Sequence, residues 1–262
     1  MSIELVSIIF IFIVGIILGS FYNVVVYRLP NNMSIVFPNS HCTNCNHELK
    51  FYELIPILSY LFLKGKCMKC NKKISIIYPI FEFITGILFL LSYLIFGFSI
   101  EFIIAVTFIS ILIIITVSDI KYYIIPDEVL LIGSLLLVVE FFINCVINKI
   151  SLVNGLFMPL LNGLGAFSLL YLFKILGDFI FKKESLGGGD IKLLFVIGLV
   201  LGFDMSVVAI FIAAFIALPL SVISLIKDDN NVLPFGPYLS IASVIILLMQ
   251  LDLDKILNLF IK

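Results

Sequence analysis

Long apolar stretches separated by short polar segments dominate the pattern of this chain. A membrane-spanning helix needs about 20 mostly apolar residues. Eight stretches reach or approach that length, over residues 5–26, 76–96, 102–117, 129–146, 156–173, 186–203, 205–226 and 237–251. The stretches over 102–117 and 237–251 are short, and Asp204 alone separates the sixth stretch from the seventh. The pattern predicts an all-α polytopic membrane protein with about eight transmembrane helices.

One polar region interrupts this pattern between the first and second stretches. We therefore expect a first transmembrane helix (1–27), a polar loop (28–75) and a membrane region with seven further helices (76–262). The composition agrees, because 62% of the residues are hydrophobic and 13% are charged, against roughly 25% charged residues in a soluble domain. The N-terminus has neither a basic segment nor a small-residue cleavage site, which predicts a retained anchor.

Basic residues are distributed unequally between the two sides of the membrane. If residues 28–75 are cytoplasmic, strict alternation of the spans leaves only Lys149, Lys255 and Lys262 outside. Cytoplasmic segments carry the excess of Lys and Arg, so we expect both termini outside and a basic inner face that contacts anionic membrane lipids. The same orientation puts Asp119 and Asp190 at the cytoplasmic face.

These two acids stand at the edges of apolar stretches. Asp119 ends one stretch, and Asp190 follows Gly187, Gly188 and Gly189 at the head of another. An ionisable residue in a membrane segment is costly and is a functional-site hypothesis by default. Two neighbouring carboxylates can share a proton and activate water, as in an aspartyl protease within the membrane. The alternative is a pair of unrelated carboxylates, each solvated at a helix end.

Residues around the two acids leave further alternatives open. Glycines before Asp190 would let a substrate strand approach the backbone, or they form a flexible loop or a close helix contact. Lys192 lies two residues after Asp190, roughly 200° around a helix, so we expect it to extend to the interface rather than to pair with the acids. Asp127, after Pro126, is a candidate third acid or, more simply, a helix N-cap.

The polar loop carries two Cys-x-x-Cys pairs, Cys42 with Cys45 and Cys67 with Cys70. Thiolates at this spacing can converge tetrahedrally on zinc. A loop this small also needs a metal or disulfides in order to fold. We predict one zinc site, against the alternative of four incidental or disulfide-bonded cysteines, which a cytoplasmic location disfavours.

The chain has two histidines, His41 and His47, and both flank the first cysteine pair. They are alternative ligands or, more simply, imidazoles beside a four-cysteine site. Because no apolar stretch contains histidine, a Ser-His protease and an H-E-x-x-H zinc protease are excluded, which leaves the aspartate pair. The sequence has neither a Rossmann-type glycine pattern nor the aromatic and basic clusters of a nucleic-acid-binding protein, so we expect no nucleic acid as a partner.

Short blocks spread over most of the chain carry a family resemblance. They are GSFYNVVVYRLP at 19–30, SHC at 40–42, LSYL at 58–61, KGKC at 64–67, ISIIYP at 74–79 with Glu82, DIK at 119–121, IPD at 125–127, the Gly-x-Gly-Asp box and PFGP at 234–237. In this order they resemble the bacterial type IV prepilin peptidases, also called leader peptidase/N-methyltransferases, which are GxGD-type aspartyl proteases.

The resemblance implies cleavage of the basic leader of prepilins and pseudopilins, after a glycine, at the cytoplasmic face of the plasma membrane, with Asp119 and Asp190 as catalytic acids. It also implies N-methylation of the new amino terminus with S-adenosylmethionine, a capacity linked to the cysteine loop, to which Gly65 and Glu82 are candidate contributors. Gly65 is equally well a turn glycine. Glu82, inside an apolar stretch, is part of a methyl-transfer pocket or the partner of a loop lysine.

Two other functions stay open on the residues alone. One is a peptidase whose zinc loop is purely structural. The other is a non-enzymatic assembly factor of a pilus or secretion apparatus, in which the two acids form structural ion pairs with lysines.

Overall fold

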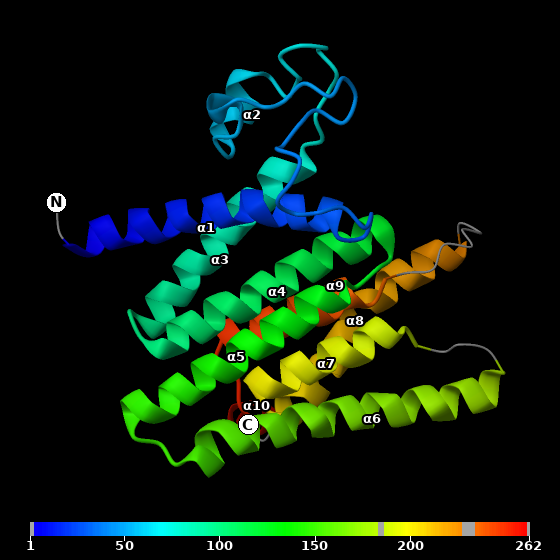
Figure 1. Cartoon of the computed structure of the whole chain (residues 1–262). Coiled ribbons are helices and arrows are strands. Elements are labelled where there is room, and N and C mark those ends of the chain that lie inside the picture. The colour runs from blue at the N-terminus through cyan, green and yellow to red at the C-terminus, as the bar shows by residue number, and fades with distance from the viewer. Residues whose placement is uncertain (1–2, 183–185, 227–233, 261–262) are drawn as a thin grey trace. The chain divides into compact units, whose positions relative to one another are not determined.

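The computed structural model of the chain describes residues 3–182, 186–226 and 234–260. These residues are almost entirely helical, as the sequence predicts (Figure 1). The helices are α1 (Ile3–Arg28), α2 (Leu58–Phe62), α3 (Ile77–Phe96), α4 (Ile100–Tyr122), α5 (Asp127–Asn148), α6 (Met158–Phe181), α7 (Gly188–Leu201), α8 (Phe203–Ile226), α9 (Gly236–Leu248) and α10 (Leu253–Phe260). A 3-10 turn, η1 (Phe51–Glu53), precedes α2, and a π-helical turn, η2 (Val153–Phe157), leads into α6.

The chain forms two compact units, Met1–Gly97 and Phe98–Lys262. The first contains α1, α3 and the polar loop between them, and the second contains the helices from α4 onward. Helix α3, which the sequence pattern groups with the later spans, packs against α1 in the first unit.

All eight apolar stretches form helices, and six of the described segments are long and apolar enough to cross a membrane. These six are Glu4–Arg28, Ile77–Phe96, Ile100–Tyr122, Asp127–Asn148, Val153–Ile180 and Phe203–Ile223. Helices α7 and α9 have 14 and 13 residues. At 1.5 Å per residue each is about 20 Å long, less than the roughly 30 Å of a hydrocarbon core.

The expectation of a short third span is wrong, because α4 has 23 residues. It begins early because the Ser99 hydroxyl caps it by accepting the Phe102 N–H, and it continues past Asp119 to Tyr122. The sixth stretch is shorter than predicted, since α7 begins at Gly188 and ends at Leu201. The near absence of a loop after it is confirmed, because Gly202 alone separates α7 from α8.

Glycines bring α1 and α3 together in the first unit. A methyl group at Gly15 would lie 2.8 Å from the Cα of Gly86, and one at Gly19 would lie 2.9 Å from the Cα of Glu82. Small residues four apart on one helix allow this backbone approach in membrane proteins. The contact fixes Glu82 beside α1.

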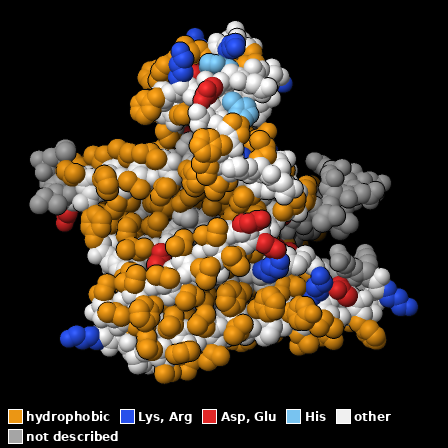
Figure 2. Space-filling view, viewed as in Figure 1, with side chains coloured by type: hydrophobic (Ala, Val, Ile, Leu, Met, Phe, Trp, Pro, Cys, Tyr) orange, Lys and Arg blue, Asp and Glu red, His pale blue; other side chains and the backbone are white. Residues whose placement is uncertain are grey.

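In the second unit, α7 lies at the centre despite its short length. Its Leu193, Leu194 and Ile197 side chains are fully buried. It packs closely on α6, because a methyl group at Gly198 would lie 2.8 Å from the Asn162 carbonyl oxygen. By contrast, α5 and α6 carry many exposed hydrophobic side chains, Leu131 among them, and hydrophobic side chains cover much of the face shown in Figure 2. This is the distribution of a helix bundle whose outer surface faces lipid.

Candidate functional site

Asp119 lies near the C-terminal end of α4 and is 6% exposed. Its Oδ2 accepts a hydrogen bond from the Gly236 N–H, 3.1 Å away, at the start of α9. The first N–H groups of a helix have no intrahelical partners and carry partial positive charge. The N-terminus of α9 therefore stabilises and orients the Asp119 carboxylate.

Asp190 lies in the first turn of α7 and is 9% exposed. A carboxylate at this position is stabilised by the helix dipole. A methyl group at Gly187 would lie 3.0 Å from Asp190 Oδ2. Asp190 Oδ1 is buried and has no hydrogen-bond partner among the described residues. A buried oxygen without a partner is costly and is explained either by a catalytic role or by a water or ion that binds there.

The structure brings the two acids together within the second unit. Asp119 is close enough to act electrostatically on the Asp190 carboxyl group. Ile125, in the link between α4 and α5, packs against both helix starts, since methyl groups at Gly189 and Gly236 would lie 2.8 and 3.2 Å from its side chain. One apolar side chain thus holds the beginnings of α7 and α9 beside the end of α4.

The lysine that follows Asp190 on α7 binds elsewhere. Lys192 Nζ lies 2.7 Å from both carboxylate oxygens of Asp127, and both side chains are largely exposed. The prediction that Lys192 does not pair with the two acids is confirmed. Asp127 itself is the first residue of α5, and Pro126 is the N-cap. Neither Asp119 nor Asp190 forms an ion pair within the described part of the chain, which argues against structural ion pairs at this site.

The four cysteines of the polar loop converge. Their sulfur atoms all lie within 4.8 Å of one another, with Cys42 and Cys70 Sγ 3.9 Å apart and Cys45 and Cys67 Sγ also 3.9 Å apart. Four Zn–S bonds of 2.3 Å in a tetrahedron put the sulfurs about 3.8 Å apart. All four cysteines are free thiols, so the cluster is compatible with a bound metal ion.

The two cysteine pairs have the same pattern of backbone hydrogen bonds. The Cys42 N–H donates to the His47 carbonyl, and the Cys67 N–H donates to the Lys72 carbonyl at nearly the same distance, 2.8 and 2.9 Å. The backbone N–H of Lys72 is the main factor that lowers the pKa of Cys70, to about 6. That of Asn44 likewise lowers the pKa of Cys42. At Cys45 the His47 backbone N–H lowers the pKa, but burial and the neighbouring thiols outweigh it and raise the pKa to about 11. Thiolates are the form that binds zinc.

Both histidines have partners outside the cluster. His41 Nδ1 lies 2.9 Å from the Asn39 carbonyl oxygen, and His47 Nε2 lies 3.1 Å from Glu53 Oε2. The metal-binding group found among the described residues contains cysteines alone. The interpretation of the histidines as neighbours of the site agrees with these contacts.

The two residues linked to methyl transfer lie in the first unit. Glu82 is 7% exposed, and its Oε2 accepts the Ile57 N–H at 2.8 Å; it also bonds to the Ser20 side chain. Its described partners therefore do not include a loop lysine. Gly65 adopts φ +64°, as the turn interpretation requires, and a methyl group there would lie 2.8 Å from the Tyr60 ring.

Three polar contacts were not predicted from the sequence. The first is the hydrogen bond from the Gly236 N–H to Asp119. The PFGP block at 234–237 supports the family resemblance, but nothing in it predicts this contact. The second is Glu53, which is buried in the loop although no pattern indicates it. The third is Glu140 on α5, whose Oε1 accepts the Thr107 hydroxyl at 2.6 Å; its signal was an acid inside an apolar stretch.

Two family models match successive parts of the chain. The Bacterial Peptidase A24 N-terminal domain matches residues 13–96, and the Type IV leader peptidase family matches residues 106–222. The first match lies within the first unit and the second within the second unit. No solved structure matches the chain.

Bacterial proteins named prepilin leader peptidase/N-methyltransferase are similar over nearly the whole length. The protein of Bacillus subtilis is 37% identical over 98% of both chains. That of Pseudomonas aeruginosa is 32% identical over 90% of this chain and 88% of its own, and that of Neisseria gonorrhoeae is 30% identical over 90% and 88%. These similarities, together with the two paired acids and the four-cysteine cluster, establish that the chain belongs to the type IV leader peptidase family.

Proposed function

We propose that this chain removes the leader of type IV prepilins or pseudopilins, cutting after a glycine, and methylates the new amino terminus. The observation that carries the proposal is the meeting of two buried carboxylates, Asp119 and Asp190, at the ends of α4 and α7. The names of the relatives support the same reaction and substrate.

Hydrolysis needs one carboxylate as a base and one carboxylic acid. The base takes a proton from water, and the water oxygen attacks the carbonyl carbon of the scissile peptide. The acid donates its proton toward the carbonyl oxygen. When the C–N bond breaks, the leaving nitrogen takes the proton that the base removed from water, and the intermediate returns a hydroxyl proton to the acid. The products are the leader's new carboxyl group and a new amine. Asp119 is oriented by the Gly236 N–H, whereas Asp190 Oδ1 has no described partner and is available to water.

The glycines before Asp190 suit this chemistry. Gly188 has no heavy atom within 4 Å of the position that a Cβ would occupy. A peptide backbone can therefore approach the start of α7 at this point. We propose that the extended cleavage segment of the prepilin lies along Gly187, Gly188 and Gly189.

We propose that Cys42, Cys45, Cys67 and Cys70 bind one zinc ion. Their sulfur spacing and their free thiols support this assignment. Zinc in such a site contributes folding free energy to a loop that has little core of its own. The methyl donor is S-adenosylmethionine, which supplies a methyl group to the new amine.

We propose that the two acids face the cytoplasm in the plasma membrane, with both termini outside and anionic lipids at the inner face. The end of α4 and the starts of α7 and α9 lie at one end of the second unit's helices, so the acids share a membrane face. The excess of basic residues in the cysteine loop supports a cytoplasmic location.

Mass analysis of a prepilin after incubation with the purified protein and S-adenosylmethionine tests this function. We expect loss of the leader and a mass increase of one methyl group on the mature chain. Loss of the leader without that increase would indicate a peptidase with a structural zinc loop. An unchanged prepilin would indicate a non-enzymatic assembly factor.

A further inference from the structure

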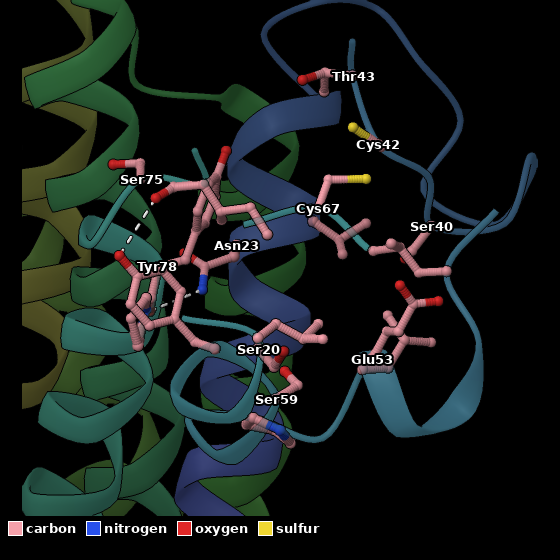
Figure 3. A pocket seen from close by; sticks show the side chains of 18 of the residues that line it. Ser20, Asn23, Ser40, Cys42, Thr43, Glu53, Ser59, Cys67, Ser75 and Tyr78 are labelled. Atoms are coloured by element: carbon pink, nitrogen blue, oxygen red, sulfur yellow. Dashed lines mark hydrogen bonds between the residues drawn. The ribbon is translucent and has the colours of Figure 1, made fainter. Parts of the chain in front are cut away.

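The first unit contains a cavity of about 430 Å³ that Cys42 and Cys67 line on one side and that extends beyond the cysteine cluster to α1 and α3 (Figure 3). It lies between the C-terminal part of α1, the start of α3 and the loop. Ser20 and Asn23 line it from α1, Tyr78 and Glu82 from α3, and Glu53 from the loop. Its volume falls in the range of small-molecule sites, roughly 300–1,000 Å³.

A carboxylate without a full set of partners lies in its wall. The Glu53 side chain is 1% exposed. Its Oε2 accepts the Lys50 N–H at 2.9 Å and lies 3.1 Å from His47 Nε2. Its Oε1 is buried and has no partner in the described residues. Buried carboxylate oxygens are almost always hydrogen-bonded in native proteins, so Oε1 indicates a missing donor.

Three lysine and arginine side chains line the cavity; Arg28 and Lys72 have other hydrogen-bond partners, and Lys73 is exposed. Arg28, 4% exposed, donates to the Ser34 and Pro38 carbonyls at 2.9 and 2.6 Å. Lys72 donates to Asn44 Oδ1 at 2.6 Å. With Glu53 and Glu82 in the wall and Lys73 also lining it, the cavity offers acceptors for a cationic group with several hydrogen-bond donors, and one lysine that can pair with a carboxylate of the same ligand.

The wall beside Glu82 is held in an unusual conformation. Ile57 has φ +60° and ψ −53°, a region that β-branched residues rarely adopt. Its N–H is the group that bonds to Glu82 Oε2. Strained backbone of this kind is found where the surrounding structure maintains a binding geometry.

We infer that this cavity binds S-adenosylmethionine, with Glu53 Oε1 accepting a hydrogen bond from the methyl donor. The inference rests on the proposed methyltransferase function. The donor is a cation at its sulfonium, carries an ammonium group, a carboxylate and two ribose hydroxyls, and has a planar base; Lys73 is the lining residue that can pair with the carboxylate. Tyr27, Tyr60 and Tyr78 in the wall supply aromatic faces for the base and for the cation.

Calorimetric titration of S-adenosylmethionine into the full-length protein, in detergent and without prepilin, tests the assignment. Glu53→Gln should weaken the affinity about tenfold or more, the usual effect of losing a charge-assisted hydrogen bond. Ser59→Trp, which adds a large side chain to the wall, should abolish binding. The matched control is Glu48→Gln, an exposed acid of the same loop that does not line the cavity, and it should bind as the wild type does.

Zinc content is measured in every variant as an independent check on the fold. Wild-type affinity in Glu53→Gln with full zinc, or in Ser59→Trp, would overturn the inference. If Glu53→Gln loses its zinc, the measured affinity of Ser59→Trp for S-adenosylmethionine alone tests the inference. Failure of the wild-type protein to bind S-adenosylmethionine would instead remove the proposed methyl transfer together with this site, so the two failures are distinguishable.

Discussion

The three glycines before Asp190 have different surroundings, although the sequence presents them as one run. A methyl group at Gly189 would lie 2.8 Å from the Cβ of Ile125, and one at Gly187 would lie 3.0 Å from Asp190 Oδ2. At Gly188 nothing lies within 4 Å. Glycine is therefore needed at position 189 so that Ile125 can pack there, and at position 187 so that the Asp190 carboxylate fits. At position 188 the structure itself leaves room for a side chain, so glycine is needed there only if a substrate lies against it.

Gly189→Ala should reduce the rate of prepilin cleavage about tenfold or more, because it forces Ile125 and the start of α7 apart and misplaces Asp190. The rate is measured by the appearance of mature pilin in detergent. Gly188→Ala is the matched variant within the same helix turn. It should cleave more slowly through a raised KM if the prepilin lies against this glycine, with no loss of thermal stability. Normal cleavage by Gly189→Ala would contradict the packing role of Ile125.

The secondary-structure elements could be predicted from the sequence where local composition alone determines them. A long apolar run has one low-energy conformation in a bilayer, the helix, so all eight stretches form helices. The cysteine spacing likewise fixes the two turns around Cys42 and Cys67. The length of α7 was not predictable, because packing against α6 allows a helix too short to span. Nor was the Gly236 contact to Asp119, which joins residues 117 positions apart.

Within the cysteine loop, Gly65 lies against Tyr60, a residue that lines the cavity. Gly65 and Gly97 have φ of +64° and +62°, so alanine is strained at both sites, and more so at Gly97, whose ψ of −160° lies in a region essentially restricted to glycine. Only at Gly65 would the methyl group also contact Tyr60, which lines the cavity. Gly65→Ala should therefore weaken S-adenosylmethionine affinity several-fold more than Gly97→Ala, by calorimetry. Equal affinities would contradict a role for Tyr60 in the site.

At the scale of the whole molecule, the proposed function assigns cleavage and methyl transfer to different compact units. Both acids belong to Phe98–Lys262, whereas the cysteines, Glu53 and Glu82 belong to Met1–Gly97. The two family models divide the chain in the same way. Damage to one unit should thus affect one reaction more than the other.

Zinc removal tests that division. Cys67→Ser removes the buried cysteine of the proposed zinc site and should lower the zinc content and loosen the loop, because metal binding in such a site contributes folding free energy. We expect methylation to fall more than cleavage, with both scored in one reaction by mass. Treatment of the wild type with a chelator should have the same effect, and zinc should reverse it. Equal loss of both activities would mean that the loop supports the entire fold.

The most direct test of the account is the cleavage rate of two purified variants, Asp119→Asn and Asp190→Asn, with a prepilin in detergent. Each replaces one carboxylate by a group of the same shape that cannot exchange the required proton, and members of a catalytic pair do not act additively. Asp127→Asn, at an exposed surface ion pair of small energetic value, is the matched control. The account predicts no detectable cleavage by either variant, with zinc content retained, and cleavage by Asp127→Asn. Near-normal cleavage by Asp119→Asn or Asp190→Asn would contradict the aspartyl mechanism.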